Sequence, residues 1–246
     1  PMVLSMMVNS LYNIIDSYFV AKINENAMTA LSLVFPVQNL ITAVGVGFGI
    51  GINATIAYFL GAQKQEKADT SATLGVACSF LHGVLLTIGT IAIMPTFLSM
   101  FTKDQEVLSM GITYSRITFG FSIIISLGIA YEKIFQSVGR MKTTMFCMMS
   151  GCILNIILDP IFIFVFRWGM MGAAVATVIG QVLTAILAVW YLLHTKSVKL
   201  DRTAFVPKKG VIVRIVSLGL CSFLAQISLV AAMAAINNML RKYGAQ

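Results

Sequence analysis

Two aspartates, Asp16 and Asp159, stand deep within apolar runs of the sequence. A carboxylate inside a bilayer costs about 3 kcal/mol or more, so it normally faces a cavity and marks the path of an ion or a proton. The structural alternative is that the carboxyl group only hydrogen-bonds a packed helix or is neutralised locally. The other acidic residues lie in predicted loops or, for Glu132, beside Lys133 near the end of a span. Asp16 and Asp159 are therefore the first candidates for chemistry.

Each aspartate lies on a polar stripe with helical spacing, and a third stripe follows in the next apolar run. The stripes are Ser5, Asn9, Tyr12 and Asp16; Cys152, Asn155 and Asp159; and Thr177, Gln181 and Thr184. At about 1.5 Å of rise per residue, Asp16, Asp159 and Thr177 are expected about 6, 10 and 8 Å below the outer ends of their helices. Polar groups at one depth can share a single site, so these three helix faces are predicted to meet around a hydrated interior.

The oxygen atoms of this predicted site suit a small cation, since two carboxylates, an amide and a hydroxyl are hard ligands. The same two carboxylates could instead share a proton, because like charges repel strongly in a low-dielectric interior. The residues therefore leave open whether the site binds a small cation or a proton.

A hinge is predicted next to the second aspartate, because Pro160 frees a backbone carbonyl one turn earlier and allows a bend. A kink with only a packing role is a comparable alternative. Gln38, Asn39 and Asn53 in the second apolar run are candidates for lining a cavity, together with Tyr12 and Gln181. For the three residues of the second run, hydrogen bonding between helices is the alternative.

The elements that position these residues follow from the composition of the 246-residue chain. It is 58% hydrophobic and 11% charged, with a mean hydropathy of +0.90, which excludes an ordinary soluble enzyme, a disordered tail and a disulfide-stapled secreted module. A span needs about 20 apolar residues. Seven are predicted, near 1–20, 28–60, 71–99, 108–138, 143–166, 172–194 and 211–240. The fold class is therefore an all-α polytopic membrane protein, and since Pro1 opens in mid-helix without an initiator Met, we expect a fragment.

The distribution of basic residues predicts the orientation. The second, fourth and sixth loops hold nine of them: Lys64, Lys67, Arg140, Lys142, Lys196, Lys199, Arg202, Lys208 and Lys209. The other loops hold Lys22, Lys103 and Arg167, and the C-terminal tail adds Arg241 and Lys242. Positive residues favour the cytoplasmic side, so the chain is expected to start inside and end outside. The net charge of +8 then reflects topology, and no nucleic-acid partner is needed.

Two further patterns have packing interpretations. Gly45, Gly47, Gly49 and Gly51 lack the following Lys-Ser/Thr of a phosphate loop, and their spacing favours close helix packing within one long second span. The four cysteines lie in apolar runs without metal-ligand spacing, so neither a structural metal site nor a cofactor is expected.

Several segments resemble the multidrug and toxic compound extrusion (MATE) transporters, bacterial members above all. They are residues 11–16 (LYNIID) with Phe19 and Val20, Phe35-Pro36, residues 45–51 with Gly61-Ala62, residues 137–140, residues 151–160 (GCILNIILDP), residues 169–177 and Gly180-Gln181. The resemblance runs in order along the whole chain, and residues 151–160 are its most specific part.

The resemblance implies twelve helices in two six-helix lobes around a central drug cavity. It also implies export of cationic, amphipathic compounds across the bacterial cytoplasmic membrane in exchange for H⁺ or Na⁺, which is not an enzyme activity. The coupling-ion site of the first lobe then maps onto Asp16, Asn155, Asp159 and Thr177, and Pro1 matches a first-helix proline associated with bending.

The chain is about half as long as a full member of that family. Residues 1–194 are expected to form the six-helix N-terminal lobe, 195–210 a cytoplasmic loop between lobes, and 211–246 the truncated first helix of a C-terminal lobe that is missing from the sequence. Two alternatives stay open: a lipid-linked saccharide flippase of the same superfamily, for which only Arg116 offers an intramembrane cation, and an intramembrane aspartyl protease. The protease would need Gly-x-Gly-Asp, whereas Leu158-Asp159-Pro160 is present.

Overall fold

The computed structural model describes residues 2–194, 198, 200 and 209–243. Within these ranges the chain forms α-helices and one π-helical turn, η1. In chain order they are α1 (Met2–Ala21), α2 (Glu25–Gly61), α3 (Gln65–Phe101), α4 (Gln105–Gly120), α5 (Ser122–Ser137), α6 (Met141–Pro160), η1 (Ile161–Val165), α7 (Met170–Leu193) and α8 (Lys209–Tyr243). Pro1, predicted as a hinge, lies outside the described residues, as does most of the predicted loop between lobes.

Six of the seven expected spans have the length and composition of membrane helices. In the described part of the chain these are α2, α3, α6 with η1, α7, the first 21 residues of α8, and the bent pair α4–α5 taken as one span. The helix α1 is not among them, because its polar stripe with Asn9, Asn13 and Asp16 lowers its hydropathy. The all-helical membrane architecture is thus confirmed, and the span with the lowest hydropathy carries Asp16.

The fourth span differs from the expected single helix over 108–138. The helices α4 and α5 meet at an angle of 46° at Phe121, whose backbone leaves the helical region at φ −102° and ψ 15°. Gly120 and Ser122 flank this residue, and such small residues are common where helices kink. By contrast, α2 runs unbroken through Pro36 and the glycine-rich stretch, as predicted.

A change in helix type follows Asp159. The α-helical hydrogen bonding of α6 ends at Pro160, and the chain continues as η1, where the Phe166 N–H donates to the Ile161 carbonyl at 3.0 Å. Proline has no N–H to donate and its ring crowds the preceding turn, so Pro160 weakens the regular hydrogen bonding at the end of α6. A π-helical turn therefore follows Asp159, a feature that is frequent at functional sites, and the hinge at Pro160 stays a prediction.

The glycines of α2 allow two neighbouring helices, α5 and α8, to approach closely. A Cβ atom on Gly45 or Gly49 would lie 2.8 Å from side-chain atoms of Ile129 or Lys133 on α5, and one on Gly47 would lie 2.8 Å from the Cβ atom of Phe223 on α8. A Cβ atom on Gly51 would overlap the backbone carbonyl of Ile215 on α8. We call these contacts of α2 with α5 and α8 the glycine seam. They confirm the predicted role of the glycines in close helix packing.

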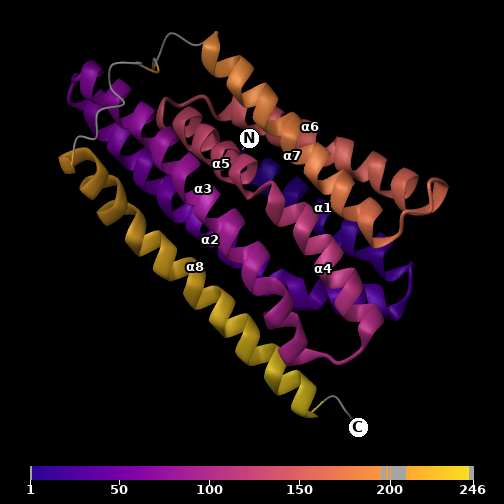
Figure 1. The fold of residues 1–246 in the computed structure, drawn as a ribbon. Helices are drawn as coiled ribbons and strands as arrows, with labels where there is room; N and C mark the ends of the chain where they lie inside the picture. The colour runs from indigo at the N-terminus through magenta and orange to yellow at the C-terminus, as the bar shows by residue number, and fades with distance from the viewer. Residues whose placement is uncertain (1, 195–197, 199, 201–208, 244–246) are drawn as a thin grey trace.

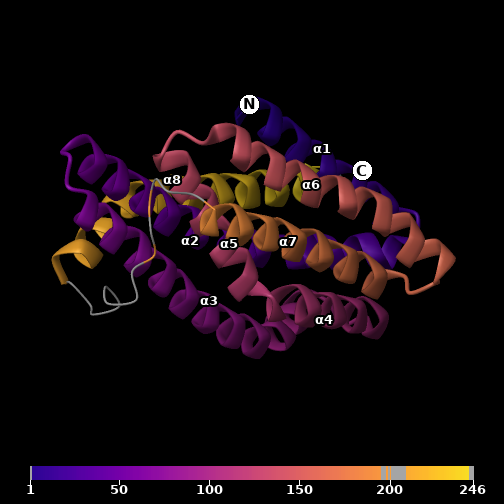
Figure 2. The same ribbon diagram turned by 90° about the horizontal axis from the view of Figure 1, so that it is seen from above.

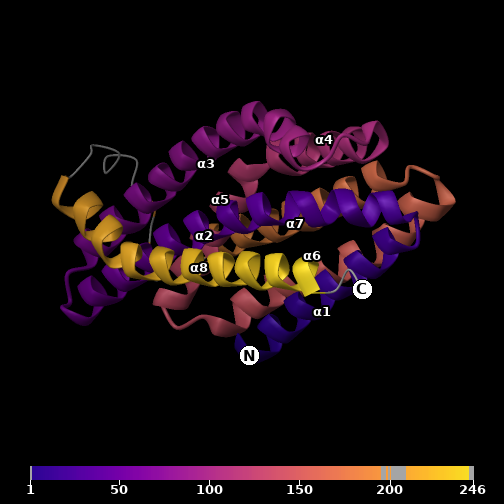
Figure 3. The same cartoon turned by 90° about the horizontal axis from the view of Figure 1, so that it is seen from below.

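The arrangement places α8 along α2 on one side of the bundle and the pair α6–α7 on the opposite side (Figure 1). The same neighbours are seen from above and from below, where α1 lies beside α6 (Figures 2 and 3). The first and third loops lie together at one end, since Asn26 Nδ2 donates to Glu106 Oε2 at 2.7 Å. Successive loops must lie at alternate ends of a bundle whose helices are connected as hairpins, so the first and third loops are expected at the same end.

Candidate functional site

Three helices bring the four predicted ion-site residues together. The helix α1 supplies Asp16, α6 supplies Asn155 and Asp159 one turn apart, and α7 supplies Thr177. Their exposed fractions are 7%, 2%, 0% and 1%, respectively. A buried polar cluster of this kind must satisfy its own hydrogen bonds, so its internal geometry decides what it can bind.

Asn155 lies between Asp159 and Thr177. In the amide orientation that satisfies both neighbours, its nitrogen donates to Asp159 Oδ2 at 3.1 Å and its oxygen accepts from the Thr177 backbone N–H at 3.0 Å. An amide is suited to this position because it offers a donor and an acceptor on one rigid plane. Asn155 therefore holds α6 against α7 and orients the Asp159 carboxyl group.

The two carboxyl groups face each other across α1 and α6. The side chains of Asp16 and Asp159 are hydrogen-bond partners, which two carboxyl groups achieve by holding a proton between them. Asp16 Oδ1 is buried and has no hydrogen-bond partner among the described residues. We call Asp16, Asn155, Asp159 and Thr177 the carboxyl site. Within the described part of the chain, this site has one carboxyl oxygen without a hydrogen-bond partner.

Two tyrosines border the carboxyl site. The Tyr12 side chain on α1 is hydrogen-bonded to Thr177. Tyr114 on α4 is 1% exposed and lies within electrostatic reach of Asp16, Tyr12 and Asp159. The sequence analysis did not single out Tyr114, although Tyr114, Ser115 and Thr118 form a polar face that could have indicated it.

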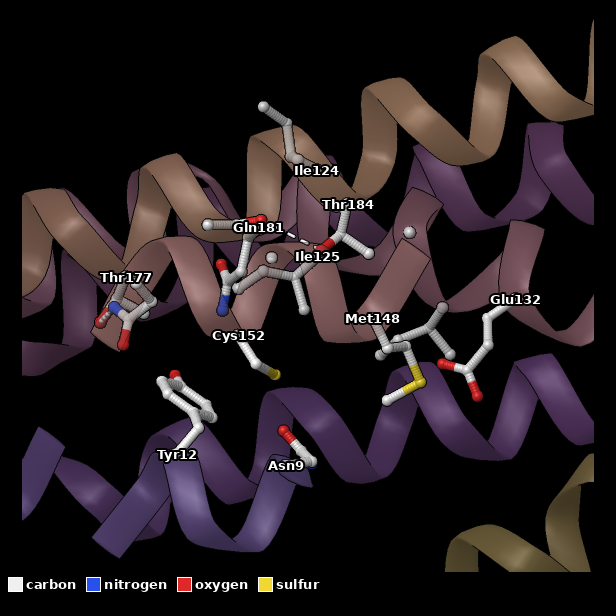
Figure 4. A pocket seen from close by; sticks show the side chains of 15 residues that line it. Asn9, Tyr12, Ile124, Ile125, Glu132, Met148, Cys152, Thr177, Gln181 and Thr184 are labelled. Carbon is white, nitrogen blue, oxygen red and sulfur yellow. Dashed lines mark hydrogen bonds between the residues drawn. The ribbon is translucent and has the colours of Figure 1, made fainter. Parts of the chain in front are cut away.

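A pocket of about 180 Å³ opens beside the carboxyl site, between α1, α5, α6 and α7. Its polar end carries Tyr12, Thr177 and Gln181, and Ile124, Ile125 and Met148 form an apolar wall (Figure 4). Glu132 lies at the far end and is the one charged residue among those that line the pocket. The pocket thus has a polar end, an apolar wall and a single carboxylate.

The structure does not bring every predicted lining residue to this pocket. Tyr12 and Gln181 line it, and Gln181 Oε1 is buried without a hydrogen-bond partner among the described residues. Gln38, Asn39 and Asn53 lie on α2, half-buried, and are not among the lining residues. Glu132, conversely, was interpreted as a residue near the end of a span and not as part of a pocket.

Comparison with known proteins identifies the family. Residues 1–161 match the family model MatE. The chain belongs to the MatE family. This family consists of transporters and not of enzymes, so the intramembrane protease alternative is discarded.

Individual MatE relatives cover nearly the whole chain. A protein named multidrug export protein MepA from Staphylococcus saprophyticus is 27% identical over 99% of this chain and 54% of its own length. One of the same name from Staphylococcus aureus is 26% identical with the same coverage. The chain therefore spans about half the length of the curated relatives it matches.

Solved MatE structures have the same helix arrangement. The outward-facing conformation of a multidrug resistance MATE family transporter of the MOP superfamily gives a TM-score of 0.92 at 31% identity, covering 97% of this chain and 53% of that one. An inward-facing conformation gives a TM-score of 0.87 at 32% identity, covering 91% and 51%. The fold is thus that of about half of a MATE transporter.

Proposed function

We propose that the full protein exports cationic, amphipathic drugs across the cytoplasmic membrane in exchange for H⁺ or Na⁺, and that this chain carries its coupling-ion site. The observation that carries the proposal is the pairing of Asp16 with Asp159 inside a membrane bundle, next to a pocket. The multidrug export proteins among its relatives support the drug-export part.

The ion part follows from charge. Two adjacent carboxylates in a low-dielectric interior are stable only with a proton or a cation between them. Losing that ion leaves two uncompensated negative charges, which favours a rearrangement that brings water or another cation to the site. Ion occupancy and conformation are then thermodynamically linked, and the coupling acts in both directions.

The segment that can respond lies next to Asp159. The turn η1 begins two residues after it, and η1 packs on α7 so closely that a Cβ atom on Gly172 would lie 2.8 Å from the Phe162 carbonyl. A change at Asp159 is therefore passed to α7, which also carries Thr177 and the pocket residue Gln181. In this proposal Pro160 and η1 form the hinge of the alternating-access cycle.

The substrate class follows from the pocket. Glu132 has a carboxylate that can attract a positive charge, and Ile124, Ile125 and Met148 offer apolar contact. Methionine and isoleucine side chains accommodate varied hydrophobic shapes, as a promiscuous binder requires. A flippase for a lipid pyrophosphate would need cationic residues instead, and the lining residues include none.

We propose the same division of the chain that the sequence predicts: residues 1–194 as an N-terminal lobe, 195–210 as a cytoplasmic loop, and 211–246 as the first helix of a second lobe. The partners are then the lipid bilayer, the drug and the C-terminal lobe of the same polypeptide. Labelling with a membrane-impermeant thiol reagent in intact cells tests the orientation. Gln105→Cys should react from outside and Ser197→Cys should not, and the reverse pattern would show the opposite topology.

Dye export tests the function. The full-length protein, expressed in cells that lack other efflux pumps, should lower ethidium accumulation, and Asp159→Asn should remove the effect at equal membrane abundance. Everted vesicles with an imposed H⁺ or Na⁺ gradient then identify the ion. Accumulation equal to that of empty-vector cells for a panel of cationic drugs, with the protein in the membrane, would contradict drug export.

A further inference from the structure

A second set of buried polar atoms lies outside the carboxyl site and the pocket. The hydroxyl groups of Thr87, Ser122 and Ser126 and the Nε2 atom of His82 are buried and have no hydrogen-bond partner among the described residues, and the buried Thr118 is hydrogen-bonded to the side chain of Tyr114. Thr118, Ser122 and Ser126 are at most 2% exposed. Leaving a buried polar atom unpaired costs about 1–3 kcal/mol, so four such atoms in one region need a common explanation.

The residues that carry these atoms belong to α3, α4 and α5, and α3 packs against both members of the bent pair α4–α5 (Figure 1). A Cβ atom on Gly83 of α3 would lie 3.3 Å from the Ser126 hydroxyl oxygen, and a Cβ atom on Gly111 of α4 would lie 3.0 Å from Leu98 of α3. Both contacts belong to the same antiparallel register. That register places Thr87 opposite Ser122, one turn further along each helix.

One end of this row meets the carboxyl site. Thr118 lies one helical turn after Tyr114 on α4 and is hydrogen-bonded to its side chain, and Tyr114 borders the carboxyl site. Thr118, Ser122 and Ser126 then continue the row at intervals of four residues across the bend at Phe121. The row thus begins next to the proposed ion.

His82 is held at the other end of the row. Its ring stacks on Phe48 of α2, with centroids 4.6 Å apart, and its Nδ1 atom is 2.9 Å from the Cys78 carbonyl. With Nδ1 bonded to its own helix, Nε2 is the ring atom left to face the interior. The charged groups nearest to this region on α5 are Lys133 and Glu132, and α2 has none after Glu25.

The α3–α5 interface stays polar beyond His82. Ser79 lies on α3, 1% exposed, and Gln136 on α5, 7% exposed, accepts from Lys133 Nζ at 3.1 Å. Both lie toward the Gln65 end of α3, which the charge distribution predicts to be cytoplasmic. A polar route therefore extends from the carboxyl site toward that end of the bundle.

We propose that Thr118, Ser122, Ser126, Thr87 and His82 bind a file of water molecules that carries the coupling proton between the carboxyl site and the cytoplasmic end of α3. Buried waters typically make two to four hydrogen bonds to polar groups that otherwise lack partners, and these side chains offer such groups at successive turns. The proton moves from the Asp16–Asp159 pair to water and along the file, with His82 Nε2 as an acceptor and donor. The proposal rests on the proposed antiport function and specifies H⁺ as the ion.

Hydroxyl-radical footprinting of the full-length protein tests for the water, because the radicals form from water next to the side chain that they modify. His82 and Met94 lie on the same helix, 9% and 1% exposed, and methionine is the intrinsically more reactive of the two. We expect His82 to be modified several-fold faster than Met94. Modification of His82 no faster than that of Met94 would overturn the water file.

A pair of serine variants tests the proton route. Ser122→Ala with Ser126→Ala removes two hydroxyl groups from the file, and Ser115→Ala is the matched control, since Ser115 on α4 is 1% exposed and donates to its own helix at the Ile112 carbonyl, 3.0 Å away. In proteoliposomes, the double variant should reduce drug-driven proton flux and H⁺-driven drug efflux about tenfold, slow His82 modification, and leave drug affinity within about twofold. The control should match wild type.

The outcomes separate this inference from the proposed function. If the double variant transports protons as fast as Ser115→Ala does while Asp159→Asn is inactive, the proton route is wrong and the carboxyl site stands. If Asp159→Asn transports normally, the proposed function itself fails. If the double variant folds poorly, Ser122→Thr is measured instead. It keeps the hydroxyl group, so its proton flux should match that of the wild type if water binding is the cause.

Discussion

The carboxyl site and the glycine seam are both buried between helices, but they are built from opposite kinds of residue. At the carboxyl site, polar side chains of α1, α6 and α7 meet and leave one carboxyl oxygen unpaired. At the glycine seam, α2 meets α5 and α8 through backbone surfaces with no room for a Cβ atom. The first arrangement keeps a binding capacity, whereas the second brings the helices into direct contact at the glycine positions. Substitutions in the two regions should therefore affect different measurements.

The largest effect is expected from the carboxyl site. Asp159→Asn should reduce coupled efflux by at least about tenfold, and Asp16→Asn should do the same, because both residues serve one ion. The double variant should be barely worse than either single one, since the two carboxyl groups form one interacting pair. Efflux normalised to membrane protein measures this.

Asp104→Asn is the matched control for these variants. Asp104 caps α4 by accepting from the Glu106 and Val107 N–H groups, and Asn caps helices equally well, so folding and efflux should stay near wild type. Reduced protein abundance with intact transport per molecule in Asp159→Asn would assign the aspartate a packing role and remove the functional contrast between the two regions.

The second effect is on folding and comes from the glycine seam. Gly51→Ala places a Cβ atom against the Ile215 carbonyl and 3.1 Å from the Gly219 nitrogen, both backbone atoms that cannot rotate away. Overpacking of this kind costs about 1–3 kcal/mol, so folded yield and melting temperature should fall. Gly89→Ala, at a position with nothing within 4 Å, should leave both unchanged.

Gly51→Ala would also reveal whether α8 is essential to the seam. Transport per folded molecule should stay within about twofold of wild type, because the carboxyl site is built from other helices. A melting temperature equal to that of Gly89→Ala would mean that α2 and α8 separate without cost.

Two neighbouring residues belong to different regions and sharpen the contrast. Glu132 lines the pocket, whereas the side chain of Lys133 covers Gly49 in the seam. They are paired at 3.2 Å. Glu132→Gln should weaken binding of a cationic dye about tenfold, or by about 1.4 kcal/mol, and leave a neutral analogue unaffected.

Lys133→Met is the partner experiment. It removes the charge but keeps an unbranched chain over Gly49, so dye binding should stay within about twofold while the melting temperature falls by a few degrees. Combining it with Glu132→Gln separates the two roles of the glutamate. If Glu132 only neutralises Lys133, the double variant regains dye affinity; if Glu132 binds the cation, affinity stays low.

The carboxyl site could be predicted from the sequence because polarity inside an apolar run is a strong signal. Asp16 and Asp159 would be too costly in lipid, so their helix faces had to point inward, and helical spacing then added Asn155 and Thr177. Their functional role stays a prediction. Tyr114 was missed because a tyrosine side chain carries no charge that would make its burial in an apolar run costly.

The pocket and the bend were less accessible for a physical reason. In a helix that is apolar on all sides, polarity does not specify which face meets which neighbour, so Gln38, Asn39 and Asn53 could not be assigned to a cavity or excluded from one. The bend at Phe121 has no proline to indicate it. The α2–α8 contact depends on where the chain returns after residues 195–210, which local patterns do not determine.

The smallest effect is expected from substitutions of two prolines. Pro160 lies beside the proposed hinge, and Pro36 lies inside an unbroken helix. Pro160→Ala restores an N–H donor next to Asp159 and allows α-helical hydrogen bonding to continue into η1. If η1 is the hinge, turnover at saturating dye should fall about threefold, with dye affinity unchanged. Pro36→Ala makes the same change inside α2, which is already continuous through that residue, so turnover should match wild type. Initial efflux rates of the two variants, normalised to membrane protein, decide the matter. Equal rates for both would mean that the π-helical turn only ends α6, and that the motion coupled to the ion lies elsewhere in the bundle.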